Sequence, residues 1–268
     1  MRRLQGQWAL VTGASSGIGK DVAEILAELG CRLVLTARRV ERLEALSSAV
    51  SEKYGTESVV IPLDLAVPGA PEKLFEETTA RGIDVDILVN NAGYGIHGFF
   101  LDVPWERTAD MLQLLINNLT HLTHLYTRPM VTRDYGFVLQ VSSIGAFQPV
   151  PGFAAYAAAK AYVLDFGVAL NHELRHSSVR CTVLCPGITI TEFQEVAGHE
   201  ALTTFERLLA MNSHEVARAA IAAMLKGKPV VVPGRINALN AWAVRLLPRS
   251  VAAAVAYLTL GPPRDLGG

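Results

Sequence analysis

The sequence predicts an α/β fold: a doubly wound parallel sheet with helices on both sides, in a single domain with an apolar helical C-terminal tail. Two observations predict this class. Short segments rich in β-branched residues alternate with segments of helical periodicity along most of the chain. The short segments are continuously apolar, which is typical of parallel strands buried on both faces. A repeated strand–helix–strand order with right-handed crossovers gives a three-layer sandwich.

Six segments are expected to form the strands of the sheet. In chain order they are residues 8–13, 32–37, 58–63, 86–93, 136–143 and 179–187. A segment of helical pattern follows each one, and the first helix begins directly after the first strand. No linker or change of composition divides the chain before Pro233. Residues 1–234 are therefore expected to form one domain.

Residues 235–268 are expected to form the helical tail. Apolar residues recur there at helical spacing, and Pro248 interrupts the pattern. One alternative is that these helices pack on the domain or on a partner subunit. The other is that they lie on a membrane surface. The membrane alternative rests on Arg235, Arg245 and Arg249, which stand beside apolar residues. No run approaches the roughly 18 apolar residues that a transmembrane span needs.

The composition excludes several classes of protein. Of the 268 residues, 50% are hydrophobic, which excludes an intrinsically disordered chain. The formal net charge of −1 gives no reason to expect a nucleic-acid partner. The N-terminus reaches glycine before any signal-peptide apolar segment, and three cysteines are too few for a disulfide framework. A cytoplasmic location is therefore expected.

The segment TGASSGIG links the first strand to the first helix. Its glycines, Gly13, Gly17 and Gly19, stand where a dinucleotide-binding turn belongs. Glycine lets the backbone approach a phosphate closely, and the N-terminus of the following helix presents N–H groups and a partial positive charge. The pattern predicts a site for the phosphates of a dinucleotide.

Three other motifs also match parts of the sequence, but each fits less well. GASSG resembles a nucleophile elbow, with Ser15 as the serine of a hydrolase, but such an elbow normally follows several strands. A P-loop would need a shorter spacing to the lysine, and Asp21 stands where it has Ser or Thr. HELRH, residues 172–176, matches a zinc motif, but a short pattern at a charged helix end arises easily by chance. No metal site is therefore predicted.

Tyr156 and Lys160 stand four residues apart in a predicted helix, so their side chains share one face. A neighbouring ammonium group favours the phenolate form of tyrosine, which makes the pair a usable acid and base near neutral pH. Ser143, at the carboxyl end of the fifth predicted strand, could donate a hydrogen bond to the same substrate oxygen. The three residues predict acid–base chemistry at a carbonyl or an alcohol.

With these motifs the chain resembles the short-chain dehydrogenase/reductase family. The resemblance rests on TGASSGIG, Asp64, NNAG (90–93), Ser143, YAAAK (156–160) and Pro186–Gly187 with Thr191, in family order over residues 5 to 233. It implies a Rossmann-type fold and hydride transfer between NAD(P)H and a carbonyl or alcohol. It further implies that Tyr156 is the catalytic acid and base, that Lys160 lowers the pKa of Tyr156 and holds the nicotinamide ribose, and that Ser143 orients the substrate.

The same resemblance implies where the cofactor binds. Asp64 and Asn91 would flank the adenosine portion, and residues 186–191 would line the nicotinamide. The expected cofactor-binding residues are Gly13, Ser15, Ser16, Gly17, Ile18, Gly19, Arg38, Arg39, Asp64, Leu65, Asn91, Ala92, Gly93, Tyr156, Lys160, Pro186, Gly187, Ile188 and Thr191. The family also implies a homodimer or homotetramer, with interfaces on the helices that begin near Pro104 and Gly152.

One position departs from the family pattern. The family has an asparagine in the helix before the fifth strand, linked to the lysine through water, and family spacing places Leu115 there. Asn117 and Asn118 follow on different helical faces. Either an irregular helix brings one of them into place, or the relay lacks this side chain. A non-catalytic NADP-binding or sensing protein therefore remains an alternative, alongside the hydrolase.

The end of the second predicted strand indicates which cofactor binds. An acidic residue there would accept the ribose hydroxyls of NAD, whereas a basic one suits the 2′-phosphate of NADP. This chain has Ala37, Arg38 and Arg39, and guanidinium groups bind phosphate well. NADP is therefore the predicted cofactor, with NADPH preferred over NADH.

The substrate is predicted only by class. Residues 192–211 occupy the family's variable substrate-lid position, and aromatic residues elsewhere suggest an apolar pocket with them: Tyr94, His97, Phe99, Phe100, Phe147 and Phe153. An apolar ketone, aldehyde or acyl carbonyl, or the corresponding alcohol, is expected.

Overall fold

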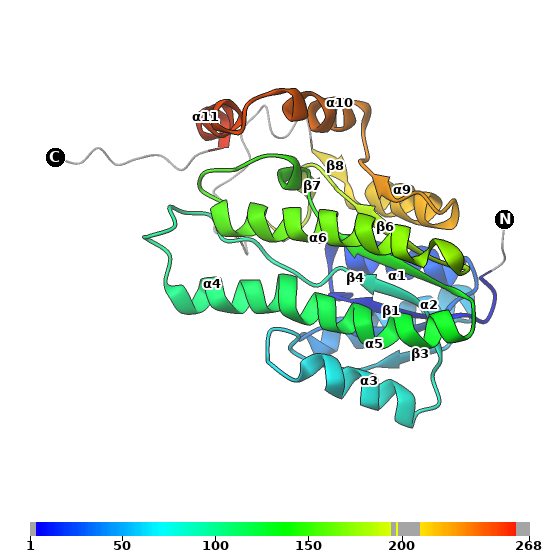
Figure 1. The fold of residues 1–268 in the computed structure, drawn as a ribbon. Helices are drawn as coiled ribbons and strands as arrows, with labels where there is room; N and C mark the ends of the chain where they lie inside the picture. The colour runs from blue at the N-terminus through cyan, green and yellow to red at the C-terminus, as the bar shows by residue number, and fades with distance from the viewer. Residues whose placement is uncertain (1–3, 194–196, 198–209, 261–268) are drawn as a thin grey trace.

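The protein forms a parallel sheet of seven strands in the order β3-β2-β1-β4-β5-β6-β9 (Figure 1). The computed structural model describes residues 4–193, 197 and 210–260. The strands are β1 (Trp8–Thr12), β2 (Arg32–Thr36), β3 (Ser58–Val60), β4 (Val85–Asn90), β5 (Gly136–Val141), β6 (Val179–Leu184) and β9 (Val230–Val231). All neighbouring strands pair in parallel. The predicted α/β class is confirmed. The six predicted strands correspond to β1 to β6, and β9 is an additional strand at one edge of the sheet.

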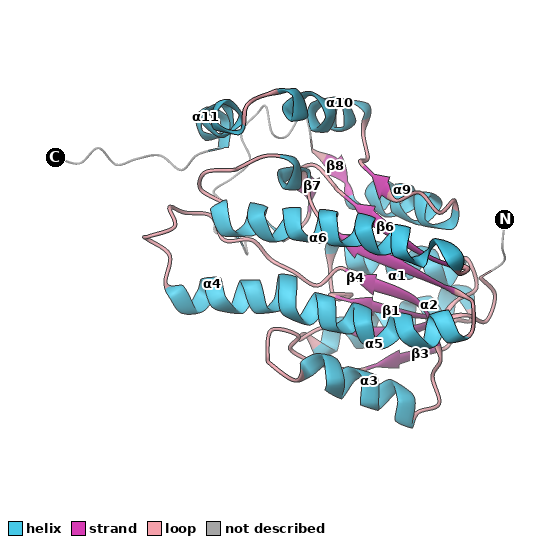
Figure 2. Ribbon diagram, in the orientation of Figure 1, coloured by secondary structure: helices cyan, strands magenta, loops and turns pink. Residues whose placement is uncertain are grey.

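Helices cover both faces of the sheet and make the three layers (Figure 2). One face packs against α1 (Gly17–Glu28), α2 (Val40–Tyr54) and α9 (Ser213–Leu225). The other face packs against α3 (Ala70–Ala80), α5 (Leu119–Thr132) and part of α6 (Ala154–Glu173).

The strand side chains alternate between these two layers. In β1, Ala9 and Val11 point into the first hydrophobic core, and Trp8 and Leu10 point into the second. Both faces of each central strand are therefore buried, which is why the strands read as continuous apolar runs. The three cysteines are buried and free.

The order of the strands positions the site. The chain runs from β1 in the middle of the sheet to β3 at one edge, then returns to β4 beside β1. A reversal of this kind opens a crevice at the carboxyl ends of the two central strands. The glycine turn follows β1, the NNAG segment begins at the last residue of β4, Ser143 lies after β5 and Pro186 after β6. The topology therefore gathers the predicted site residues at one edge.

A π-helical segment, Gln113–Asn118, joins α4 (Trp105–Leu112) to α5 without a break in the helix axis (Figure 1). Leu115 and Asn118 are its buried residues, and Asn117 is exposed. π-Helical turns of this kind are rare and often lie at functional sites.

The predicted helix pair of the C-terminal tail is confirmed as α10 (Arg235–Ala243) and α11 (Arg249–Leu260), which lie beyond β9 and α6 (Figure 1). Small residues face inward: Ala241, Ala252 and Ala256 are buried. Large apolar residues of α10 and the turn after it face solvent, since Ile236, Leu239, Trp242 and Leu246 are 59% to 68% exposed. The remainder of the predicted tail, residues 261–268, lies outside the described residues.

Two further features complete the described chain. β7 (Thr189–Ile190) and β8 (Met211–Asn212) pair in parallel as a small separate sheet. Within residues 4–193, 197 and 210–260, no helix combines the length and apolar character that crossing a bilayer requires.

Candidate active site

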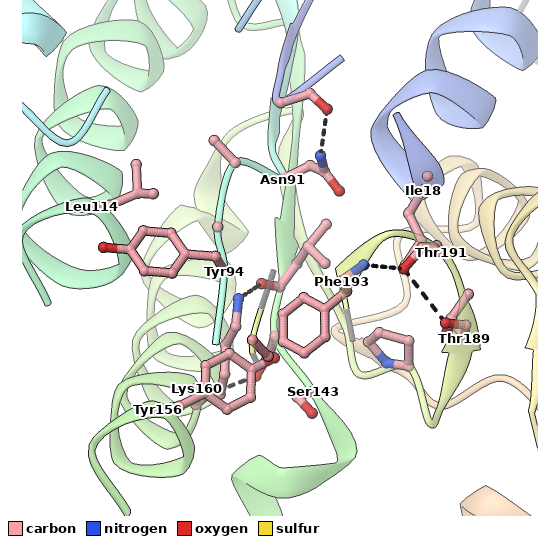
Figure 3. Close-up of a pocket in the computed structure, with 18 of the residues that line it drawn as sticks. Ile18, Asn91, Tyr94, Leu114, Ser143, Tyr156, Lys160, Thr189, Thr191 and Phe193 are labelled. Carbon is pink, nitrogen blue, oxygen red and sulfur yellow. Dashed lines mark hydrogen bonds between the residues drawn. The ribbon is translucent and has the colours of Figure 1, made fainter. Parts of the chain in front are cut away.

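One cavity of about 450 Å³ opens at the carboxyl ends of the strands, and every predicted site residue except Gly19 lines it (Figure 3). It is continuous from Arg38 and Arg39, past the glycine turn, to Ser143, Tyr156 and Lys160. Residues that the sequence analysis did not single out also line it, among them Leu63, Ala66, Leu114, Val141, Ile144, Gln148 and Val150. Ala37, Thr189, Glu192 and Phe193, which lie in predicted segments, line it as well.

The glycine turn has the backbone that its sequence requires. Gly13 and Gly17 have φ values of +66° and +54°, in the left-handed region that favours glycine. A Cβ on Gly17 would lie 2.9 Å from Cγ2 of Thr191, which packs on the turn from across the cavity. Ser16, at the N-cap of α1, makes no side-chain capping bond, so the first N–H groups of the helix can bind an anion.

Gly19 is not among the residues that line the cavity, and it packs against the NNAG segment. A Cβ there would clash with Nδ2 of Asn91. This amide donates hydrogen bonds to the carbonyl oxygens of Thr12 and Gly13, at 2.9 and 3.2 Å. The Thr12 hydroxyl in turn accepts from the backbone N–H groups of Asn91 and Ala92, each at 2.9 Å. The NNAG segment therefore fixes the glycine turn as well as lining the cavity.

Tyr156 and Lys160 leave the same face of α6 and meet Ser143 at the inner end of the cavity (Figure 3). The Lys160 ammonium lies 5.6 Å from the centre of the Tyr156 ring and donates a hydrogen bond to the Val141 carbonyl oxygen at 2.8 Å. The Ser143 hydroxyl accepts from the Gly145 N–H at 3.1 Å, which fixes its position at the start of a short 3₁₀ turn.

Burial dominates the electrostatics of this group. Burial lowers the pKa of Lys160 from 10.5 to about 8, because the low-polarity surroundings disfavour the ammonium. Burial raises the pKa of Tyr156. Its hydrogen bond with Ser143 acts in the opposite direction but has a smaller effect, so the pKa of Tyr156 is raised overall. Lys160 is not among the groups that shift the pKa of Tyr156, so the expectation that Lys160 lowers this pKa stays a prediction. Because burial raises its pKa, Tyr156 is a neutral phenol at physiological pH.

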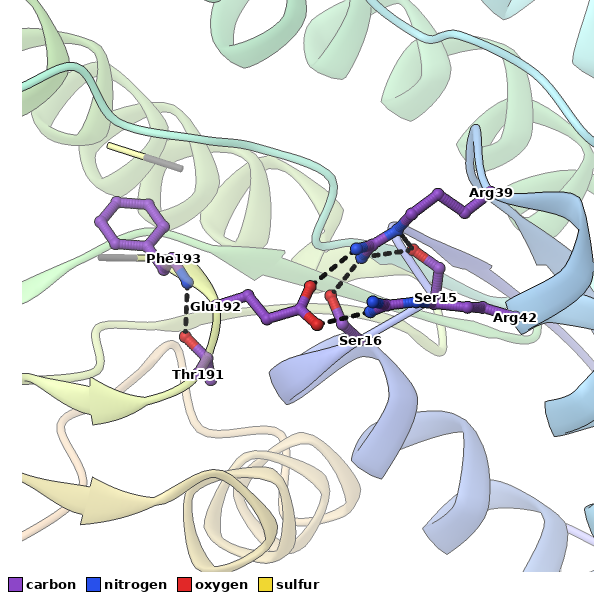
Figure 4. A network of polar contacts seen from close by, with 7 residues as sticks. All are labelled: Ser15, Ser16, Arg39, Arg42, Thr191, Glu192 and Phe193. Carbon is purple, nitrogen blue, oxygen red and sulfur yellow. Dashed lines mark hydrogen bonds and ion pairs between the residues drawn. The ribbon is translucent and has the colours of Figure 1, made fainter. Parts of the chain in front are cut away.

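Polar contacts at the other end of the cavity link the end of β2 to the segment after β7 (Figure 4). Arg39 donates hydrogen bonds to the hydroxyls of Ser15 and Ser16, at 3.1 and 2.8 Å, and pairs with the Glu192 carboxylate at 2.7 Å. Arg42 pairs with the other oxygen of Glu192. Motif reasoning missed Arg42 and assigned Glu192 to the predicted substrate lid rather than to an ion pair. The two residues stand 150 apart in sequence and belong to no shared pattern.

Arg38, the other basic residue predicted here, is more exposed than Arg39. Its side chain is 68% exposed and lies 3.9 Å from the Asp64 carboxylate. Asp64 also accepts a hydrogen bond from the Ala66 N–H at 2.9 Å, which shapes the loop after β3.

Aromatic side chains line the inner cavity, although not all those expected. Tyr94 and Phe153 line it together with Phe193, whose ring centre lies 5.5 Å from that of Tyr156. His97 packs on Phe153, Phe99 contacts Tyr257, and Phe147 lies under the Arg245 guanidinium. His97, Phe99, Phe100 and Phe147 are absent from the cavity lining. Most of the predicted lid, 194–196 and 198–209, lies outside the described residues.

Comparison with known proteins identifies the family. The profile of the short chain dehydrogenase family matches residues 7–201. The chain belongs to the short-chain dehydrogenase/reductase family. It is 32% identical to the 7beta-hydroxysteroid dehydrogenase of Collinsella aerofaciens over 191 residues, 71% of this chain and 72% of that protein. It is 34% identical to the human very-long-chain 3-oxoacyl-CoA reductase over 195 residues, 71% of this chain and 62% of that protein.

Solved structures of short-chain dehydrogenases/reductases share the fold over nearly the whole chain. A 7beta-hydroxysteroid dehydrogenase superposes with a TM-score of 0.86 at 26% identity, covering 95% of this chain and 98% of the other. A short-chain dehydrogenase from Sphingobium yanoikuyae, in complex with NADPH, gives 0.81 at 27% identity, with 98% of each chain covered. The chain is thus an oxidoreductase of this family by fold and by sequence.

The asparagine expected in a short-chain dehydrogenase/reductase is absent from this site. The π-helical segment is an irregularity of the kind anticipated, but it brings neither candidate to Lys160. Asn118 instead donates to the carbonyl oxygens of Leu65 and Val67, at 2.6 and 3.1 Å, and Asn117 donates to Gln113. Leu115 is fully buried against Gly93 beside Lys160. The relay therefore lacks this side chain.

The competing motifs find no structural support. The Ser15 hydroxyl accepts from Arg39 rather than from a histidine. In the HELRH segment α6 ends at Glu173, a 3₁₀ turn follows, and both histidines are exposed. No group of three or more potential metal ligands occurs within the described part of the chain. The family assignment likewise does not favour a hydrolase or a non-catalytic binding protein.

Proposed function

We propose that this protein is an NADP(H)-dependent oxidoreductase that transfers hydride between the nicotinamide and an apolar carbonyl or alcohol, with Ser143, Tyr156 and Lys160 as its catalytic residues. The observation that carries the proposal is a single cavity with this trio at one end and the guanidinium group of Arg39 at the other. A dinucleotide has its nicotinamide and its adenosine phosphate at opposite ends, and the cavity has the matching chemistry.

The residues present fit such a cofactor. The glycine turn and the uncapped start of α1 would hold the pyrophosphate. Asp64, Leu65 and Asn91 to Gly93 would flank the adenosine, and Pro186, Gly187, Ile188 and Thr191 would line the nicotinamide. When bound, the cofactor supplies the hydride donor or acceptor.

Tyr156 supplies the proton in carbonyl reduction. Its phenol is neutral because burial raises its pKa, so it can donate a hydrogen bond and then the proton to the carbonyl oxygen. The Ser143 hydroxyl donates a second hydrogen bond to that oxygen and fixes its position. Lys160, held by the Val141 carbonyl, places its amine beside the phenol and favours the phenolate left after proton transfer.

The preference for NADP rests on charge. The three residues that follow β2 are Ala37, Arg38 and Arg39, so none of them is the acidic residue that would accept the ribose hydroxyls of NAD. Arg39 lies on the two serines of the glycine turn, which brings its guanidinium close to the pyrophosphate site. A similar structure from this family was solved with NADPH.

The substrate is proposed to be a bulky apolar carbonyl compound or alcohol. Tyr94, Phe153 and Phe193 line the inner cavity around Tyr156. The names of similar proteins point to the same class, since they act on a hydroxysteroid and on very-long-chain 3-oxoacyl-CoA. The chain spans about 60% of the length of the latter proteins, at 62% for the human one.

The test is a screen of apolar ketones, aldehydes and alcohols, monitored by NADPH and NADH absorbance. We expect NADPH to support turnover far better than NADH. Replacing Tyr156 by Phe is expected to lower kcat by about 100-fold or more, because the proton donor is lost. Tyr162→Phe, an exposed tyrosine of the same helix, is the matched control.

Undiminished turnover in Tyr156→Phe would refute the mechanism. Tight binding of NADPH with no turnover on any compound would instead favour a sensing protein. Equal efficiency with NADH and NADPH in the unmodified protein would refute the cofactor preference.

The protein is also proposed to act in the cytoplasm as a homodimer or homotetramer. Exposed apolar residues on the helices implicated by the family, α4 and α6, support assembly: Trp105 and Val168. The outward apolar residues of α10 provide a second surface that a partner subunit could cover. Peripheral contact of the tail with a membrane is the alternative occupant of that surface.

A further inference from the structure

The carboxylate of Glu192 occupies the cationic end of the cofactor cavity (Figure 4). One oxygen accepts from Arg39 at 2.7 Å, and the other accepts from Arg42. Arg39 is at the same time bound to Ser15 and Ser16 of the glycine turn. The acidic side chain therefore sits on the guanidinium group that the proposed function assigns to the 2′-phosphate.

This carboxylate reaches the arginines from the opposite wall of the cavity. Glu192 lies between Thr191, which packs on Gly17, and Phe193, which packs on Tyr156. Arg39 and Arg42 belong to the start of α2, 153 and 150 residues away in sequence. The contact bridges the cavity where a nucleotide carrying a 2′-phosphate would have to enter.

The charges make Glu192 a ligand that a phosphate can replace. Arg42 and Arg39 lower the pKa of Glu192 to about 2, so the side chain is an anion at physiological pH. All three side chains are 39% to 48% exposed, and exposed ion pairs are weak because solvent screens them. A phosphate carries up to two charges and three acceptor oxygens, which favours it over one carboxylate at a pair of guanidinium groups.

We propose that Glu192 is a specificity-determining residue that competes with the 2′-phosphate of NADP(H) for Arg39 and Arg42, an inference that rests on the proposed cofactor. Binding of a 2′-phosphorylated nucleotide requires Glu192 to leave the arginines, so the net affinity is reduced by the cost of breaking the two ion pairs. A nucleotide without the 2′-phosphate has no group to exchange for the carboxylate. Glu192 therefore reduces the discrimination between NADPH and NADH that the arginines would otherwise give.

The experiment measures nucleotide binding rather than turnover. Affinities of 2′,5′-ADP, 5′-AMP, NADPH and NADH are determined by calorimetry and by nucleotide fluorescence for the unmodified protein, Glu192→Gln and Glu192→Ala. Both variants are expected to bind 2′,5′-ADP and NADPH more tightly, by up to about 30-fold, the upper limit set by two exposed ion pairs. Binding of 5′-AMP and NADH is expected to stay within about twofold.

Glu44→Gln is the matched control, because it removes an exposed carboxylate from the same helix as Arg42 without a recorded ion pair. It is expected to leave all four affinities unchanged. Arg42→Gln in the Glu192→Gln background is expected to abolish most of the gain for 2′,5′-ADP. Thermal unfolding checks that each variant is folded.

The possible results separate the two proposals. If the unmodified protein prefers 2′,5′-ADP to 5′-AMP but Glu192→Gln does not strengthen the preference, the competition is refuted and the NADP assignment stands. If only the variant shows the preference, the competition is supported and the NADP preference of the natural chain is refuted. If no protein distinguishes the two nucleotides, both proposals are refuted. An equal gain in Glu44→Gln would assign the effect to net charge and overturn the role of Glu192.

Discussion

At the scale of single residues, Lys160 is the buried charge of the site. Only 4% of its surface is exposed, and its amine has one recorded hydrogen bond, to the Val141 carbonyl. The shift of its pKa from 10.5 to about 8 corresponds to about 3 kcal/mol of lost stability while the amine is charged. This loss of stability occurs at the position where the proposed chemistry needs an amine.

Replacing Lys160 by Met is therefore expected to stabilise the protein at pH 7. Below pH 8 the lysine is protonated in both the folded and the unfolded chain, so the full cost of burial applies. Between pH 8 and pH 10.5 the folded chain releases the proton first, and the cost fades. After the loss of the hydrogen bond to Val141 is subtracted, the free energy of unfolding should rise by about 2 kcal/mol at pH 7. This increase should shrink toward pH 10.5.

Urea unfolding at both pH values measures this difference. Lys73→Met, at an exposed position, is the control with no cost of burial to remove. A gain of equal size at both pH values, or a loss of stability at pH 7, would show that the burial of a charge is not what limits the stability here.

At the scale of elements, the two adjacent asparagines of the π-helical segment, Asn117 and Asn118, make different contacts. Asn118 is buried and ties this segment to the loop after β3, since it donates to the carbonyls of Leu65 and Val67 and accepts from Gln113 at 2.8 Å. Val67 has a second donor in the Ala70 N–H, whereas Asn118 is the donor recorded for Leu65. Both asparagines are candidates for the lysine relay by sequence, but the hydrogen bonds tie Asn118 to the loop after β3, part of which lines the cavity.

Replacing Asn118 by Ala is expected to lower the free energy of unfolding by about 1–3 kcal/mol, because the buried Leu65 carbonyl loses its donor. It should also weaken nucleotide binding, since Asp64, Leu65 and Ala66 line the cavity. Asn117→Ala, at the neighbouring exposed position, should change stability by less than about 0.5 kcal/mol. Denaturant unfolding and nucleotide titration compare the two, and equal effects would refute the assigned role.

At the scale of the whole molecule, the tail presents its apolar side to solvent. The buried apolar residues of the tail are Ala241, Ala252 and Ala256, and its outward face carries Ile236, Leu239, Trp242 and Leu246. An apolar surface of this kind is typical of an interaction site. It adjoins the active site, because Asn237 of α10 packs against Gly187 and Arg245 lies over Phe147.

Charge on this surface is expected to reduce the assembly of subunits. In Leu239→Glu with Trp242→Glu, light scattering after size-exclusion chromatography should show a smaller oligomer than the unmodified protein, because burying two carboxylates in an interface is costly. Ser51→Glu, at an exposed position on α2, is the control. A monomeric unmodified protein that sediments with anionic vesicles through these residues would support the membrane alternative instead.

The sequence by itself determined the class of fold, the six main strands and the segments that form the cavity. It could do so because buried parallel strands impose continuous apolar runs, and because every motif except YAAAK lies at the carboxyl end of a strand, where the order of strands brings it to the site. Only the tertiary structure decided which arginine lies on the glycine turn and which carbonyl groups Asn118 binds. It also decided that Glu192 pairs with the arginines. Those contacts join residues far apart in the chain, such as Glu192 and Arg39, and no local pattern of side chains encodes them.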